Sequence, residues 1–251
     1  MRAAAGHISD MRSRTGRSAA PTQAATVEVA GRRVDLAVRR SPRARRLYLR
    51  VDPVEAHVEL ILPRWVGLQE GLRFANDKRG WLEARLAAIP ARTPFADGTV
   101  ITVFGDPLTI RHRPEARGAV RRDGTDLVVT GAAEHLARRV RDWVKAQARR
   151  ELAARSHAVA ARIGRHIARV RISDPRSRWG SCSARGGLAY SWRLALAPPA
   201  VADYVIAHEV AHLVEHNHGP RFWRVVAELA PEAETAKAWL RRNGNALLRY
   251  G

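Results

Sequence analysis

Four histidines lie close together in one short stretch of the chain, AHEVAHLVEHNHGPRF, residues 207–222. His208 and His212 are four residues apart, and on a helix this spacing places both imidazoles on one face. Glu209 follows the first histidine and completes the pattern H-E-x-x-H. In this pattern two histidines bind zinc, and the carboxylate accepts a proton from the water that the metal activates. The stretch therefore predicts a catalytic zinc site.

The same residues could instead form a polar stripe on the solvated side of a helix. The sequence around them favours a buried helix, because apolar residues occur on nearly every side of it. Buried imidazoles and a buried carboxylate need polar partners, which a metal ion supplies. The apolar residues are Val201, Val205, Ile206, Val210, Ala211, Leu213 and Val214.

A catalytic zinc site has three protein ligands, and His216 and His218 are the candidates for the third. His216 continues the helical row, which places it about 12 Å along the axis from His208. His218 lies in the turn-forming segment NHGP, residues 217–220, and can fold back toward the first pair. We therefore expect His208, His212 and His218 to bind the metal, and His216 to lie at the surface or beside the ligands.

The elements that must position these residues follow from the hydrophobic periodicity. Alternation predicts strands at residues 26–31, 33–38, 45–51, 57–63, 126–130 and 168–173, and hairpins at 99–112 and 178–197. A period of 3.6 predicts helices at 66–86 and 132–163, and a third that Pro198 and Pro199 open. We expect an α+β fold with a disordered basic tail at 1–24 and a β-rich region at 25–131. A zincin-like metallopeptidase domain at 132–251 would carry the H-E-x-x-H helix.

The composition excludes several classes of protein. The chain has 251 residues, of which 46% are hydrophobic, enough to bury a sizeable core. No apolar run approaches the roughly 18 residues of a membrane span, and the first thirty residues contain no signal-peptide core. The single cysteine, Cys182, excludes an internal disulfide framework and favours a cytoplasmic location. We expect it to be a reduced strand residue rather than a zinc ligand.

The chain carries a formal net charge of +20. Such a charge attracts phosphate-bearing partners, which makes nucleic acid or a nucleotide a candidate partner. The cations are nearly all arginines and are spread along the chain, which is also what the coding bias of a GC-rich genome produces. The charge alone therefore does not decide between these two explanations.

Several segments resemble the YgjP-like metallopeptidase family, which is related to the SprT-like peptidases, including the Spartan DNA-repair proteases. The features that carry the resemblance are RWGSC (178–182), Pro198-Pro199, Asp203-Tyr204-Val205, the H-E-x-x-H pattern, and NHGP followed by Phe222-Trp223. Residues 39–53 and 74–86 are similar to the opening segments of the family. The resemblance covers most of the chain from about Val34. It implies a zinc-dependent peptidase with His218 as the third ligand, and it defines no substrate.

These observations predict a zinc metallopeptidase, a hydrolase in which zinc-bound water activated by Glu209 attacks the carbonyl of a peptide or protein substrate. Tyr190, Arg193 and Tyr204 are candidates for substrate binding and oxyanion stabilisation, although each could equally be a packing or surface residue. The strand at 187–196 could receive an extended peptide by strand addition, or it could be an ordinary core strand.

Two other functions stay open at this point. A metal-dependent nucleotide phosphohydrolase of the pyrophosphatase type could use the same site, and the net charge of +20 would attract its substrate. A nucleic-acid-associated protein could use the zinc for structure alone. Three histidines suit zinc better than Mg²⁺ or Mn²⁺, and structural zinc sites have four protein ligands, so the peptidase is the leading hypothesis.

Overall fold

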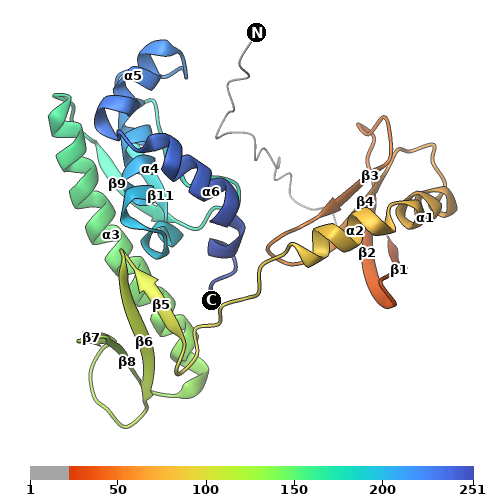
Figure 1. Ribbon diagram of the computed structural model, residues 1–251, viewed down its shortest axis with the longest axis horizontal. Coiled ribbons are helices and arrows are strands. Elements are labelled where there is room, and N and C mark those ends of the chain that lie inside the picture. Colours follow the sequence, from red (N-terminus) through yellow and green to blue (C-terminus); the bar gives the residue numbers. More distant parts are fainter. Residues whose placement is uncertain (1–22) are drawn as a thin grey trace. The chain divides into compact units, whose positions relative to one another are not determined.

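The computed structural model describes residues 23–251, which divide into two compact units between Ala91 and Arg92 (Figure 1). Most of the tail predicted at 1–24 lies outside the described residues. Its last two residues, Gln23 and Ala24, differ from the prediction because they form the start of strand β1. They pair there with Val38 and Ala37 of the neighbouring strand.

The first unit is a four-stranded sheet with two helices packed against one face (Figure 1). In spatial order its strands are β1 (Gln23–Val29), β2 (Arg32–Arg40), β4 (Val58–Leu62) and β3 (Tyr48–Val51). The helices are α1 (Leu68–Asp77) and α2 (Arg79–Ala87). The single helix predicted at 66–86 is thus two, because Lys78 leaves helical geometry with φ −97° and ψ 12°.

The second unit begins with another four-stranded sheet, followed by a long helix. Its strands are, in spatial order, β5 (Val100–Val103), β6 (Asp106–Arg113), β8 (Asp126–Thr130) and β7 (Arg121–Asp123). A short 3-10 turn, η2 (Ala133–His135), leads into α3 (Leu136–Arg162). The buried residues of α3 recur at every fourth position, which makes one continuous stripe along the helix. They are Leu136, Val140, Val144, Ala148, Leu152, Ser156 and Ala160.

The remaining elements of this unit surround a three-stranded sheet of order β10-β11-β9. Its strands are β9 (Arg169–Ser173), β10 (Gly180–Cys182) and β11 (Gly187–Ser191). After β11 come a 3-10 turn, η3 (Trp192–Leu196), and the helices α4 (Pro199–Ala211), α5 (Pro220–Leu229) and α6 (Ala233–Leu247). The hairpin predicted at 178–197 therefore exists, but its second strand ends at Ser191 and the chain then turns.

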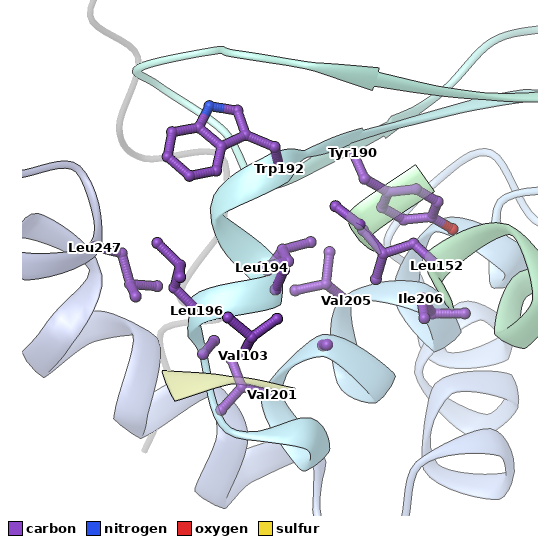
Figure 2. Packing of buried hydrophobic residues seen from close by; sticks show 14 of the residues in the cluster. Val103, Leu152, Tyr190, Trp192, Leu194, Leu196, Val201, Val205, Ile206 and Leu247 are labelled. Carbon is purple, nitrogen blue, oxygen red and sulfur yellow. The ribbon is translucent and has the colours of Figure 1, made fainter. Parts of the chain in front are cut away.

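One hydrophobic core joins both sheets of the second unit to α3 and α4. Figure 2 shows Val103 of β5, Leu152 of α3, Tyr190 of β11 and Val205 of α4 in this one cluster. The strands between residues 100 and 130 thus pack with the C-terminal elements, which differs from the domain boundary predicted near Gly131. Periodicity identifies strands but does not show which core they join.

The fold is mixed α+β, with strands dominating the N-terminal half and helices the C-terminal part, as the sequence predicts. None of the helices in the described residues combines the length and the apolar character that crossing a membrane requires.

Candidate metal centre

Helix α4 is the central element of the site. Pro198 caps its start and Pro199 occupies the first turn, where proline costs no intrahelical hydrogen bond. The helix is apolar on all sides and is almost completely buried against α3, α5, α6 and β10. His208 and Glu209 lie in its last turn and are each only 6% exposed. The helix therefore carries polar side chains into the interior, where they need partners.

Three histidines converge at the end of this helix: His208, His212 and His218. Their ligand atoms all lie within 4.8 Å of one another, and the Nε2 atoms of His208 and His218 are 3.2 Å apart. Two nitrogens that bind one tetrahedral metal ion at about 2.1 Å lie about 3.4 Å apart. The side chains present therefore fit a metal ion.

His212 is held by its own backbone turn. It follows the last residue of α4, and its Nδ1 donates a hydrogen bond of 3.1 Å to the Glu215 carbonyl. A metal-binding histidine usually donates its second ring N–H to a carbonyl or carboxylate, which sets the tautomer and the orientation of the ring. This bond leaves the Nε2 of His212 as the nitrogen available to a metal ion.

His218 comes from the turn between α4 and α5. The Gly219 N–H donates to the Asn217 carbonyl at 2.8 Å, and the Trp223 indole donates to the His218 carbonyl at 3.1 Å. These bonds tie the turn to the first part of α5. His216 is exposed and does not belong to the three-histidine group. The helical row expected from the sequence does not reach it, because α4 ends at Ala211 and His216 lies in the turn that follows.

Phe222 packs against all three histidines. This ring is completely buried, and its centroid lies 4.9 Å from that of His208 and 4.6 Å from those of His212 and His218. Phe222 was not among the site residues predicted from the sequence, where it belongs only to the family resemblance. Its spacing could have indicated that it packs near the histidines. Phe222 is four residues after His218 at the start of a helix, where side chains four apart share a face.

Burial shifts the pKa of two groups at the site in opposite directions. Desolvation lowers the pKa of His208 to about 3, with His212, His218 and Lys237 adding to the effect, so that the imidazole is neutral, the form that can bind a metal. Desolvation raises the pKa of Glu209 to about 8, while the charge of Arg178 opposes the shift. An ionisable pair perturbed in this way within one cavity is typical of a functional site.

Strand β10 approaches the Glu209 side chain closely. A Cβ atom at Gly180 would lie 2.6 Å from the Cγ and Oε1 of Glu209, so only glycine fits here without displacing the carboxylate. The sequence did not predict that Gly180 and Arg178 lie beside Glu209, because neither is near Glu209 along the chain. The tryptophan-glycine pair within RWGSC was the one feature of the sequence that could have indicated a close approach to the site.

The histidines and Glu209 line a cavity of about 360 Å³ in the second unit. Its other walls are residues 177–182, which include β10, and Tyr204, Val205, His216 and Leu240. Strand β10 is an edge strand whose one partner in the described sheet is β11. The strand predicted at 187–196 was a candidate for the peptide-binding edge or for a core strand. Its first five residues form β11, which is central, with β10 on one side and β9 on the other.

The three predicted substrate-binding residues lie in different places. Tyr204 lines the cavity, and its hydroxyl is buried without a hydrogen-bond partner among the described residues. Tyr190 does not line the cavity; it is fully buried, with its hydroxyl 3.0 Å from the Ser156 Oγ. Arg193 also lies outside the lining, paired with Asp174. The structure thus brings only Tyr204 to the histidines.

Cys182 lines the same cavity as a free cysteine. Burial, followed by the charge of Glu209, raises the pKa of its thiol to about 11, so the sulfur is protonated at neutral pH. It is not a member of the histidine group. This is the reduced strand residue that the sequence predicts.

Three convergent imidazoles beside a carboxylate, in a cavity with room for a substrate group, are typical of metal-dependent hydrolases. A family model described as "YgjP-like, metallopeptidase domain" matches residues 45–243. The chain therefore belongs to the YgjP-like metallopeptidase family, as its motifs indicate. The family implies a metal ion, and the three histidines could bind one. Comparisons with curated proteins and with solved structures gave no match.

Proposed function

We propose that this chain is a zinc-dependent peptidase in which His208, His212 and His218 bind the metal and Glu209 transfers the proton. The observation that carries the proposal is the convergence of three imidazoles within 4.8 Å, beside a buried glutamate in the same cavity. An all-nitrogen ligand set favours zinc over Mg²⁺ or Ca²⁺, which prefer oxygen. Three ligands leave the fourth tetrahedral position for water or substrate.

A bound zinc ion supplies two effects here, acidification of water and polarisation of a carbonyl group. The protein's contribution is the placement of Glu209. Its carboxyl group is desolvated and lies against Gly180 of β10, in space that any larger residue there would take. A carboxylate held in this way can accept a proton from the attacking water and return it to the leaving amine. Burial raises the pKa of Glu209 in the metal-free site, and the charge of a bound dication would lower it again, which favours the carboxylate form that accepts a proton.

The edge strand β10 offers a place for the substrate. Its residues Gly180, Ser181 and Cys182 line the cavity, and its second edge has no strand partner in the described sheet. An extended peptide that adds to this edge by main-chain hydrogen bonds would run past Glu209. Tyr204, with its unpartnered hydroxyl, would then be a donor near the reacting carbonyl.

The test compares the wild type with Glu209→Gln and the control Glu234→Gln, which changes an exposed glutamate on α6 outside the cavity. Each protein is analysed for bound metal and assayed against a peptide library and a nucleotide panel. We expect all three to bind one zinc per chain, and Glu209→Gln to lose roughly 10²- to 10⁴-fold in peptide hydrolysis.

Full peptidase activity in Glu209→Gln would contradict the role of this residue. Phosphate release that depends on Glu209, without proteolysis, would replace the peptidase with the nucleotide phosphohydrolase. A chain that binds no zinc would exclude both enzymes.

A further inference from the structure

A second cavity of about 620 Å³ lies in the same unit as the metal centre and shares no lining residue with it. Its walls come from the turn between β5 and β6, from β7 and from α3 (Figure 1). The volume falls within the range of small-molecule sites in proteins. The lining residues are Val103, Phe104, Asp106, Leu108, Val120, Arg121, Arg122, Trp143, Gln147, Arg150, Glu151 and Arg155.

The cavity combines an aliphatic and aromatic wall with a cationic rim. Arg121 and Arg122 stand on β7, while Arg150 and Arg155 stand on α3, so that guanidinium groups come from two separate elements. The lining contains two carboxylates against these four cations. Even with Asp203 of α4, which contacts Arg155, the cations are in excess. The charge of the cavity therefore complements an anion.

The carboxylates that already pair with the rim arginines compete only weakly with such an anion for the guanidinium groups. Arg122 and Asp106 are 2.5 Å apart but are 47% and 56% exposed. Arg155 and Asp203 are 3.0 Å apart and are 29% and 51% exposed. Glu151 pairs with Arg150 at 3.3 Å and with Arg155 at 4.0 Å, and its side chain is 36% exposed. Exposed pairs of this kind contribute little net free energy. A phosphate, which guanidinium groups bind in a bidentate manner, can replace them at low cost.

The backbone at Phe104 gives an independent sign of function. This residue has φ 50°, and with Gly105 at φ 93° it forms the turn between β5 and β6. Such a turn favours asparagine or glycine at its first central position, and a bulky side chain there is strained. The Phe104 N–H donates to the Ala195 carbonyl at 2.7 Å, which holds the strained turn in place. The chain thus keeps an aromatic ring in the cavity at a cost in conformational energy.

Phe104 and Trp143 are the two aromatic residues of the lining, and the Arg155 guanidinium lies 4.9 Å from the centroid of the Phe104 ring. Aromatic side chains beside arginines form the usual binding surface for nucleotide units, because bases stack on the rings and phosphates bind the guanidinium groups.

We propose that this cavity binds a nucleotide unit, with the base against Phe104 and Trp143 and the phosphate on the rim arginines. A free nucleotide and a nucleotide within a single strand share this chemistry. The proposal does not depend on the peptidase function, because no residue of the metal centre takes part.

The experiment uses the full chain and two probes, AMP and an end-labelled oligothymidylate of ten nucleotides, titrated by calorimetry and by fluorescence anisotropy. Phe104→Asn removes the ring but suits the left-handed turn, so the relief of backbone strain offsets part of the packing that the ring makes with the core, and thermal melting checks that the variant is folded. Arg122→Ala removes one rim charge. The control Arg138→Ala removes an exposed charge from the same helix α3, outside the cavity.

We expect Phe104→Asn and Arg122→Ala each to weaken binding about fivefold or more, and Arg138→Ala to leave it unchanged. Binding of AMP identifies a free nucleotide as the source, and binding of the oligonucleotide alone identifies a single strand. The proposal is overturned if neither probe binds at millimolar concentration. It is also overturned if Phe104→Asn binds like the wild type, or if Arg138→Ala weakens binding as much as Arg122→Ala, since general charge attraction would then explain the result.

Discussion

The contact between Gly180 and Glu209 makes a sharp test of the active-site geometry. In Gly180→Ala the new Cβ would lie 2.6 Å from the Cγ and Oε1 of Glu209 and 2.8 Å from its Cδ. Ordinary contacts of a Cβ atom begin at 3.4 Å, so the overlap with Cγ is 0.8 Å. The backbone of Gly180 is not in the left-handed region, so alanine adds a steric conflict without backbone strain.

The carboxylate must therefore move by nearly 1 Å, because it is the more adjustable of the two partners. A displacement of that size at a catalytic group costs about 10²-fold in rate. The three atoms nearest to the new methyl group all belong to Glu209, so we expect the metal content to stay at the wild-type level. We expect kcat/KM for peptide hydrolysis to fall about 100-fold while zinc binding is retained.

The assay measures kcat/KM on a peptide selected from the library, together with zinc per chain by elemental analysis. Gly80→Ala is the matched control, since a Cβ at Gly80 meets nothing within 4 Å. An unchanged kcat/KM in Gly180→Ala, with zinc bound, would refute the reasoning: either Glu209 is not held by β10, or its position does not matter for catalysis.

Three further outcomes are expected. His218→Ala should weaken zinc binding roughly 100-fold or more, whereas His216→Ala should leave it unchanged; equal effects in a competition titration would argue against the ligand assignment. In the metal-free protein, the raised pKa of Glu209 means that ionising this group lowers the free energy of unfolding. This loss of stability is absent below about pH 4.5 and grows as the pH rises toward 8. Glu209→Gln should therefore stabilise that form on the order of 3 kcal/mol at pH 7 and very little at pH 4.5, and urea denaturation that shows equal gains at both pH values would contradict the burial effect. Phe222→Ala should cost about 3–5 kcal/mol of unfolding free energy and also weaken zinc binding; a cost below 1 kcal/mol in urea would show that the ring does not support the histidines.

Much of the site could be predicted because its geometry is local. His208 and His212 are four residues apart, so a helix places both on one face without any contact from a distant part of the chain. The choice of His218 follows from the turn residues around it. The helical rise that was expected to carry His216 away does not apply, because α4 ends at Ala211. The structure groups the same three histidines and leaves His216 exposed.

The surroundings of the site could not be predicted in this way. Tyr190 and Arg193 occur on the strand and turn that lead into α4, but one is buried in the core and the other is paired with Asp174. The side of a strand that faces a cavity depends on which neighbours pair with it. For the same reason β11 is central and β10 is the edge. The division of the chain near Ala91 depends on which core the strands of residues 100–130 join.

The sequence by itself determined the class of chemistry, the metal-binding histidines to be tested and the mixed α+β character of the fold, because these depend on residue type and short-range spacing. Only the tertiary structure decided the pKa of Glu209, the role of Gly180 beside it and the second cavity with its rim of arginines. These properties arise from desolvation and from contacts between segments that are far apart in the chain. Residue order specifies such contacts only through the complete fold.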